Sequence, residues 1–393
     1  MPKKIVDGIY YVGSRHWDRR LFDELIPLPD GTTYNAYVVK GSEKIVLIDT
    51  VDPSKTRELL ENLNELHFDR IDYIISNHAE QDHSGSIPAL LEKYPMAKVV
   101  TNAKCKGFLK DLLLIEDEKF IVINDGDTLS LGNKTLEFIL APWVHWPETM
   151  FTYLQEDKIL FSCDFLGSHL ATSKLFVSEE PEVYEAAKRY YAEIMMPFRS
   201  MIKNHLKKLE NYDIKIVAPS HGPVYEKPEF IINAYRDWIS DEVKNEVVLI
   251  YVSMHDSTKV IAEHLIKKIE EKGIVVKPFN LTVSDIGEIA MALVDAATVI
   301  LASPTVLTGL HPYAANAAFI MNALRPKTKF VGFVGSYGWG SKVIEQTKQL
   351  LNNLKAEFLE PILIKGYPKE HDFEELDKFV EILYEKHNKL GVL

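Results

Sequence analysis

The hexapeptide HAEQDH, His78 to His83, contains two imidazoles and two carboxylates, all of them metal-ligating groups. It follows an apolar, β-branched run, Ile71 to Ile75, which is typical of a buried strand. The donors therefore come where a strand ends and a loop begins. In an extended chain the side chains of residues 78, 80 and 82 project to one side, and a turn then brings His83 beside them. This stretch predicts a metal-binding loop at a strand end.

Length and composition suggest a two-domain protein that acts on small molecules. At 393 residues the chain exceeds the size at which a single core stops growing. We expect domains at 1–245 and 246–393, because the pattern changes near Asp241 to Asn245. The net charge of −12, with no basic stripe, argues against nucleic-acid binding. No apolar run reaches membrane-spanning length and no secretion signal is visible, so we expect a soluble, cytoplasmic protein.

Further metal donors occur where later strands of the first half end. His145 follows LEFILAPWV, Asp164 follows KILFSC, and His221 follows KIVAPS. A single histidine of this kind is usually an ordinary polar residue, but the joint pattern of donors at successive strand ends predicts one shared site. Seven donors suffice for two metal ions if one carboxylate bridges them. Only Cys105 and Cys163 are present, which excludes a disulfide framework and a rubredoxin or cysteine-ligated iron–sulfur centre within the chain.

The pattern HxExDH followed by a separate His, Asp and His resembles the metallo-β-lactamase-like domain of flavodiiron proteins. GTTYNAYVV and RYYAEIMMPF resemble the same family, and the resemblance covers essentially the whole chain. It implies an αββα sandwich over 1–245. It also implies two iron ions held by seven residues: one ion by His78, Glu80 and His145, the other by Asp82, His83 and His221, with Asp164 bridging.

Glu80 separates this pattern from that of the hydrolytic members of the superfamily, which usually carry HxHxDH and bind zinc. A carboxylate in place of an imidazole makes the site harder and more negative, which favours iron over zinc. A zinc-dependent hydrolase with an accessory flavodoxin domain remains the alternative. A pure electron carrier is a second alternative, although it would need no site with seven donors.

The second half predicts a doubly wound, flavodoxin-like domain over 246–393. Five apolar runs, EVVLIYVS, VVKPFNL, TVILASPT, KFVGFVGS and PILIKGYP, are typical of parallel strands buried on both faces. Helical patterns alternate with them at 258–272, 285–294, 314–324, 341–354 and 372–388. In a sheet with the strand order 2-1-3-4-5, the loops after strands 1, 3 and 4 converge at the switch point, where such a fold holds FMN.

The loops at that switch point carry the groups expected to bind the flavin. SMHDST precedes a helix, whose N-terminus and hydroxyls suit a phosphate without a countercharge. Trp339 could stack on the isoalloxazine. The family commonly has an aromatic residue in the phosphate segment, where this chain has Met254, His255 and Asp256. The expected cofactor contacts are Ser253, Met254, His255, Asp256, Ser257, Thr258, Ser303, Pro304, Thr305, Gly309, Ser336, Tyr337, Gly338 and Trp339.

A diiron centre and a flavin in one chain indicate reduction of a small gas rather than hydrolysis. The expected activity is reduction of O2 to water, of NO to N2O, or of both, and the sequence does not decide between the gases. By resemblance, FMN relays electrons from an external donor, rubredoxin. The family also forms head-to-tail homodimers that place one subunit's FMN beside the other's irons, so we expect a homodimer or a tetramer built from it.

Several other polar residues near the predicted site have simpler interpretations. Strand alternation predicts that Cys163 is a small core residue facing away from the metals. We expect His169 and His205 at the surface or behind the ligands. Tyr190 and Tyr191 either place a hydroxyl over the metals or pack between helices.

Overall fold

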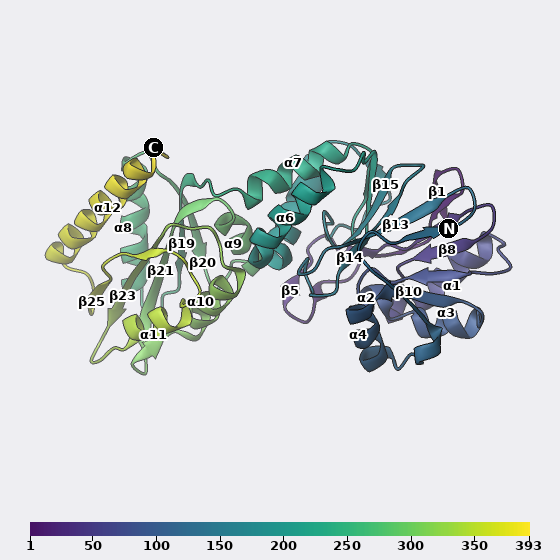
Figure 1. Ribbon diagram of the computed structural model, residues 1–393. Coiled ribbons are helices and arrows are strands. Elements are labelled where there is room, and N and C mark those ends of the chain that lie inside the picture. Colours follow the sequence, from purple (N-terminus) through teal and green to yellow (C-terminus); the bar gives the residue numbers. More distant parts are fainter. The chain divides into compact units, whose positions relative to one another are not determined.

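The computed structural model describes residues 1–393 and divides into two compact units. The N-terminal unit comprises residues 1–191 and 198–239, and the C-terminal unit comprises residues 192–197 and 240–393. Each unit has its own sheets and helices (Figure 1). No helix combines the length and the apolar character needed to cross a membrane.

The first sheet of the N-terminal unit is mixed. Its parallel half supplies the strand that ends at the HAEQDH loop. The strand order is β1 (Lys3–Val6), β2 (Ile9–Tyr11), β7 (Tyr37–Lys40), β8 (Ile45–Ile48), β9 (Tyr73–Ile75), β10 (Lys98–Asn102) and β11 (Phe120–Ile123). Three helices cover its outer face: α1 (Thr56–Glu65), α3 (Ile87–Lys93) and α4 (Ala103–Leu113). Leu59, Leu90 and Leu109 from these helices pack against Leu47 and Val99 of the sheet.

The second sheet faces the first across a shared apolar core. Its strand order is β12 (Thr128–Ser130), β13 (Thr135–Leu140), β14 (Met150–Leu154), β15 (Ile159–Cys163), β17 (Ile216–Pro219), β18 (Val224–Tyr225) and β16 (Phe176–Val177). Phe138 and Phe161 of this sheet pack against Ile48 and Ile75 of the other. Its outer side meets two helices, α6 (Arg199–Leu209) and α7 (Pro228–Ile239). The unit is therefore the expected αββα sandwich.

Two short hairpins precede the sandwich strands that carry donors. They pair β3 (Ser14–His16) with β6 (Thr32–Tyr34), and β4 (Leu21–Phe22) with β5 (Ile26–Pro27). The ring of Phe22 lies 5.2 Å from that of His169 and 6.4 Å from that of His221. The second hairpin therefore lies close to one of the predicted metal donors.

One local prediction was wrong. The HAEQDH segment does not stay extended, because residues 81–84 form a short helix, α2 (Gln81–Ser84), in which Ser84 N donates to Glu80 O. The helical segment over 181–210 is interrupted. It consists of α5 (Pro181–Tyr190), a π-helical turn (Tyr191–Met195), a 3₁₀ turn (Met196–Phe198) and α6. Pro197 lacks the N–H that a continuous helix needs, which accounts for a break at this point.

The C-terminal unit has the expected flavodoxin-like strand order, with one insertion. The parallel sheet runs β20 (Val275–Asn280), β19 (Lys244–Tyr251), β21 (Ala296–Val306) and β23 (Phe330–Tyr337). At its edge β24 (Glu357–Phe358) and β25 (Ile362–Lys365) both pair with β23. The short strand β22 (Gly309–Leu310) folds back on the end of β21. The predicted order 2-1-3-4-5 is confirmed.

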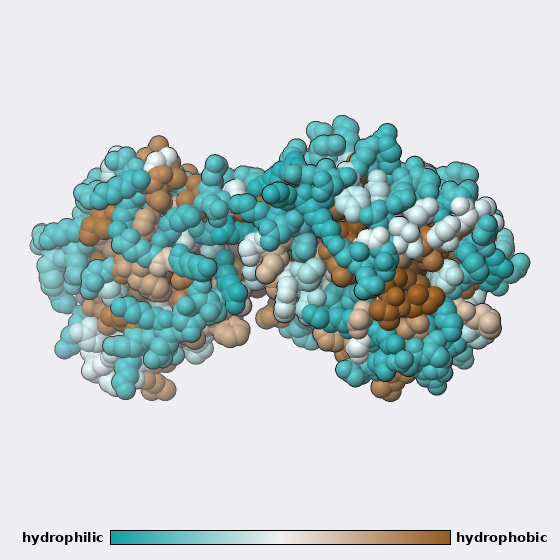
Figure 2. Space-filling model, in the orientation of Figure 1, coloured by the Kyte–Doolittle hydropathy of each residue, from teal (hydrophilic) through white to brown (hydrophobic).

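Helices cover both faces of this sheet. Side chains of α9 (Ile286–Leu293), α10 (Pro312–Leu324) and α11 (Val343–Leu350) pack on one face, and those of α8 (Ser257–Glu271) and α12 (Glu370–Leu390) on the other. The helix expected over 341–354 ends at Leu350, before a turn that leads to β24. Figure 2 shows a mostly hydrophilic surface with apolar patches on each unit.

Candidate metal centre and flavin site

The seven predicted metal donors come together within the N-terminal unit. His78 follows β9, His145 lies in the loop between β13 and β14, Asp164 follows β15 directly, and His221 follows β17. Strand ends at one edge of the two sheets therefore bring together residues that are up to 143 positions apart in the sequence. The remaining donors are Glu80, which precedes α2, and Asp82 and His83, which lie on it.

The first group of donors is His78, Glu80, His145 and Asp164, whose ligand atoms all lie within 4.8 Å of one another. Glu80 Oε2 is 3.0 Å from His78 Nε2 and 3.1 Å from His145 Nε2. Asp164 Oδ2 is 3.5 Å and 3.6 Å from the same two nitrogens. Both imidazoles thus direct Nε2 toward one point between the two carboxylates.

The second group is Asp82, His83 and His221. Asp82 Oδ1 is 3.3 Å from His83 Nε2, and Asp82 Oδ2 is 3.1 Å from His221 Nε2. Asp164 Oδ1 is 2.9 Å and 3.4 Å from these nitrogens. One oxygen of Asp164 therefore faces each group, which is the geometry that a bridging carboxylate requires.

These side chains have the unsatisfied polar atoms expected of a metal site. Both carboxylate oxygens of Asp82 and Oδ2 of Asp164 are buried and make no well-aligned hydrogen bond, although imidazole nitrogens lie within 3.6 Å of each. Leaving such charged atoms unpaired costs free energy, and buried charges are normally paired or coordinate metal. Two metal ions, one per group, would satisfy these oxygens. The mixed set of four imidazoles and three carboxylates suits iron.

The electrostatics of the site show what metal would displace. Burial alone would raise the pKa of the Glu80 carboxyl, but hydrogen bonds with His145 and His78 outweigh burial and hold it far below its ordinary value. Burial would lower the pKa of the His221 imidazole, yet Asp164 and Asp82 raise it to about 10. Without metal the site is thus a network of carboxylates paired with imidazolium groups. A metal cation would take the place of those protons.

Two groups that the sequence did not indicate orient the imidazoles. His78 Nδ1 lies 2.7 Å from Glu148 Oε1, and His221 Nδ1 lies 2.6 Å from the backbone oxygen of Thr33. Both acceptors require a proton on Nδ1, which leaves Nε2 directed at the donor groups. No spacing in the sequence relates Glu148 to His78, which is 70 residues away.

The neighbouring residues differ in part from expectation. His169 lies behind a ligand, which is one of the two positions expected for it: it is buried, with Nδ1 2.9 Å from Thr32 Oγ1 and its ring 4.8 Å from that of His221. Cys163 does not face away from the metals. Its Sγ lies within 4.8 Å of donor atoms of His83 and Asp164 because its φ of 52° ends the strand alternation. The Tyr190 hydroxyl donates to Asp164 Oδ1 at 3.0 Å, so this tyrosine does place its hydroxyl at the site.

Two other residues have mainly structural surroundings. The Tyr191 hydroxyl donates to the Trp238 backbone oxygen at 3.3 Å, in an aromatic cluster between helices. His205, on α6, is half-buried and its Nε2 lies 2.9 Å from the Pro142 backbone oxygen.

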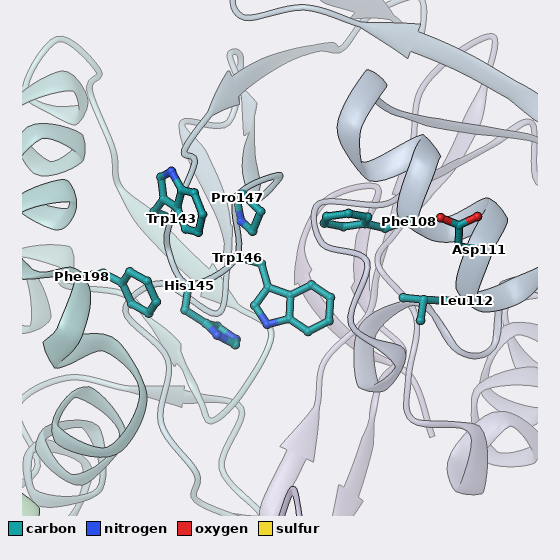
Figure 3. Close-up of a pocket in the computed structure, with 8 residues that line it drawn as sticks. All are labelled: Phe108, Asp111, Leu112, Trp143, His145, Trp146, Pro147 and Phe198. Atoms are coloured by element: carbon teal, nitrogen blue, oxygen red, sulfur yellow. The ribbon is translucent and has the colours of Figure 1, made fainter. Parts of the chain in front are cut away.

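An apolar pocket of about 440 Å³ adjoins His145 (Figure 3). Its lining is almost entirely aromatic and aliphatic, and His145 and Asp111 are its only ionisable side chains: Phe108, Asp111, Leu112, Trp143, His145, Trp146, Pro147 and Phe198. In the close-up, the indole of Trp146 and the ring of His145 lie side by side. A pocket of this kind suits small, weakly hydrated molecules rather than charged ones.

A second cavity, of about 160 Å³, lies at the switch point of the C-terminal sheet. Ten of the predicted flavin contacts line it: Ser253, Met254, His255, Ser257, Thr258, Pro304, Thr305, Ser336, Tyr337 and Gly338. Gly366, after β25, also lines it and was not predicted. Thr258 Oγ1 and Ser336 Oγ lie 3.1 Å apart and join the first loop to the third. Hydroxyls at the start of the fifteen-residue helix α8 suit a phosphate.

Four predicted flavin contacts do not line this cavity. Asp256 forms the N-cap of α8 with a φ of 64°, and Gly309 lies in β22. The hydroxyl of Ser303 donates to the Pro304 backbone oxygen at 2.9 Å and accepts from His311 N at 3.3 Å. Trp339 is 77% exposed. Their contacts with a flavin stay predictions.

Comparison with known proteins places the chain in a family. Residues 32–222 match the model of the ODP family beta lactamases. A nitric oxide reductase of Moorella thermoacetica is 35% identical over 91% of each chain. A coenzyme F420H2 oxidase of Methanothermobacter marburgensis is 34% identical over 89% of each chain. The solved structure of the rubredoxin oxygen:oxidoreductase of Desulfovibrio gigas matches all of this chain with a TM-score of 0.96 at 29% identity.

The chain belongs to the flavodiiron proteins. This family consists of oxidoreductases that combine a diiron centre with FMN, and both sites have counterparts here. The chain is therefore an oxidoreductase, and a hydrolase is not favoured. The fold expected from the sequence is confirmed in both halves.

Proposed function

We propose that this flavodiiron protein reduces O2, NO or both at the cluster of seven donors. The observation that carries the proposal is the arrangement of the donors in two groups that share Asp164. One group would hold one iron through His78, Glu80 and His145, and the other would hold the second iron through Asp82, His83 and His221. A diiron centre supplies two electrons, and a reduced flavin supplies two more.

The residues around the donors fix the bridging carboxylate and line an apolar approach to the site. Burial and the neighbouring carboxylate of Asp164 raise the pKa of the Tyr190 hydroxyl well above its ordinary value, so this hydroxyl keeps its proton at neutral pH. Its hydrogen bond fixes one oxygen of Asp164. The apolar pocket beside His145 offers a route for a small gas and favours it over charged solutes. Neither feature distinguishes O2 from NO.

Electrons must come from a carrier outside residues 1–393. Residues 1–393 include two cysteines, both buried, and no CxxC pair, so they hold no rubredoxin centre. We propose that FMN lies in the cavity at the switch point and receives electrons from an external donor. Rubredoxin appears in the name of one structural relative and coenzyme F420H2 in that of another relative, and these are the two donors to test first.

We further propose that the protein works as a head-to-tail homodimer. Large apolar side chains are exposed near the loops of the flavin cavity, among them Met254, Leu307 and Trp339. The N-terminal unit exposes Trp143 and Leu112 at the pocket beside His145. Exposed apolar groups of this kind are typical of protein interfaces. Burying one set against the other in a two-fold dimer would bring flavin loops close to metal donors.

The test is gas consumption by the purified protein loaded with iron and FMN. Reduced rubredoxin and F420H2 are supplied separately, and O2 and NO are supplied separately under otherwise anaerobic conditions. Catalytic consumption of at least one gas supports the proposal. Reoxidation of the flavin without turnover of either gas would indicate an electron carrier, and would refute it. Sedimentation of the same sample tests the dimer.

A further inference from the structure

Glu148 is a buried carboxylate that the donor groups do not include. It lies three residues after His145, in the loop that leads into β14, and its side chain has no exposed surface. Oε1 lies 2.7 Å from His78 Nδ1 and 3.1 Å from the backbone nitrogen of Ala79, whereas Oε2 is buried without a partner. Asn102 donates to the Glu148 backbone oxygen at 2.6 Å. Glu148 therefore ties the loop of His145 to the loop of His78.

The contact between Glu148 and His78 has two chemical consequences. A carboxylate can only accept from an imidazole, so His78 keeps a proton on Nδ1, and Nε2 is the nitrogen that would bind a metal. A hydrogen bond to an anion also makes the imidazole a stronger base and a better electron donor to a bound metal. The backbone contact with Ala79 fixes the angle at which the ring enters the site.

The second donor group has no equivalent anion. His221 donates to the neutral backbone oxygen of Thr33, and His83 Nδ1 is buried without a partner. Asp49 is the other buried carboxylate behind the donors. Its oxygens accept from the backbone and side chain of Asn77 and from Ser220, rather than from an imidazole. The carboxylate of Asp49 therefore acts on His83 only through space, whereas that of Glu148 is hydrogen-bonded to His78.

We propose that Glu148 is a positioning residue that makes the two metal positions unequal, so that the iron held by His78, Glu80 and His145 binds more tightly and is oxidised first. The inference rests on the proposed ligand assignment. Removal of one electron from the diferrous protein by an outer-sphere oxidant such as ferricyanide would leave the ferric charge at this position, because ferric iron gains more than ferrous iron from the extra anion.

Glu148→Gln tests the proposal, because glutamine keeps the shape and an accepting oxygen but removes the charge. Glu92→Gln, on the exposed side of α3, is the matched control for loss of one negative charge. Both are compared with the wild type as full-length protein with FMN bound. Chelator competition yields the two Fe²⁺ dissociation constants. Mössbauer spectra of ⁵⁷Fe-loaded protein, before and after addition of one oxidising equivalent, show where the ferric charge lies.

In Glu148→Gln one of the two dissociation constants should rise ten- to hundredfold, while the other matches the control. The preference of the ferric charge for one position should fall about tenfold, which corresponds to 59 mV in a one-electron couple. Equal effects on both irons, or spectra identical to those of Glu92→Gln, would overturn the inference and leave the metal assignment intact. A wild-type protein that does not bind two irons would overturn both the inference and the metal assignment.

A measurement on the wild type covers the case in which Glu148→Gln does not fold. Protein with ¹⁵N-labelled histidine is loaded with Zn²⁺, which is diamagnetic, and its imidazole N–H protons are observed by NMR. His78 should show an Nδ1–H proton that exchanges slowly and lies further downfield than that of His221, because it is bonded to an anion rather than to a carbonyl. Absence of a slowly exchanging Nδ1–H on His78 would contradict the proposal.

Discussion

Acid should destabilise the C-terminal unit through a single buried histidine, His387. This residue, near the end of α12, has no exposed surface. Its Nε2 lies 2.8 Å from Thr298 Oγ1 and its Nδ1 lies 2.8 Å from Asn245 Oδ1. The amide oxygen of Asn245 accepts from Nδ1–H, and the hydroxyl of Thr298 donates to Nε2, so the neutral ring is fully satisfied. A second proton would remove the acceptor that Thr298 uses.

Burial lowers the pKa of His387 from 6.5 to about 4. The folded state therefore stays neutral while the unfolded state binds a proton as the pH falls below 6.5. The stability that the neutral His387 ring contributes is fully present above pH 6.5 and is lost as the pH falls from 6.5 to about 4. At 1.36 kcal/mol per pKa unit, a difference of about 2.5 units amounts to about 3 kcal/mol.

Hydrogen exchange of the peptides that cover α12, followed by mass spectrometry at a series of pH values, measures the free energy of opening of this helix. Between pH 6.5 and 4, the free energy of opening of α12 should fall by about 3 kcal/mol more in the wild type than in His387→Leu. His387→Leu should be less stable at pH 7, because Thr298 loses a buried partner. His371→Gln, on the exposed side of the same helix, should behave as the wild type. Equal acid sensitivity of wild type and His387→Leu would refute the reasoning.

Three further predictions concern the metal centre. Burial alone would lower the pKa of His83, but the carboxylates of Asp164 and Asp82 outweigh burial and raise this pKa above 6.5. Fe²⁺ binding should therefore release protons, and the affinity for Fe²⁺ should increase as the pH rises. Calorimetry in buffers of different ionisation enthalpy measures this, and proton-neutral binding would contradict it. His145→Asn should keep FMN but lose iron from one position and lose gas reduction. The control His205→Asn should retain FMN, both irons and gas reduction. Full iron content and turnover in His145→Asn would exclude His145 as a ligand. Leu112→Trp should narrow the pocket beside His145 and raise the KM for the gas severalfold at unchanged iron content, and an unchanged KM would show that the gas enters elsewhere.

The position of the donors could be predicted from the sequence because strand ends can be recognised in it. Parallel strands bring their carboxyl ends to one edge of a sheet, and His78, Asp164 and His221 each follow an apolar strand with a parallel neighbour. The flavin loops follow the same rule in the C-terminal sheet. Gly366 was overlooked there, although it follows the fifth strand and therefore reaches the same edge.

Other features of the site depend on tertiary structure and leave no periodic signal in the sequence. Glu148 meets His78 only because two loops from different sheets come together. The direction of Cys163 follows from a left-handed backbone conformation, which a strand pattern does not indicate for a residue other than glycine. The short helix α2 replaced the expected extended strand end because four residues carry too little periodicity to reveal a helix.

The central claim is that two irons occupy the two donor groups, with Asp164 between them. A crystal structure of the protein purified with its metals, with anomalous data collected on both sides of the iron absorption edge and at the zinc edge, tests it most directly. Two iron peaks are expected, one among His78, Glu80 and His145 and one among Asp82, His83 and His221, each in contact with a different oxygen of Asp164. A single peak, or two peaks that appear only at the zinc edge, would contradict the account.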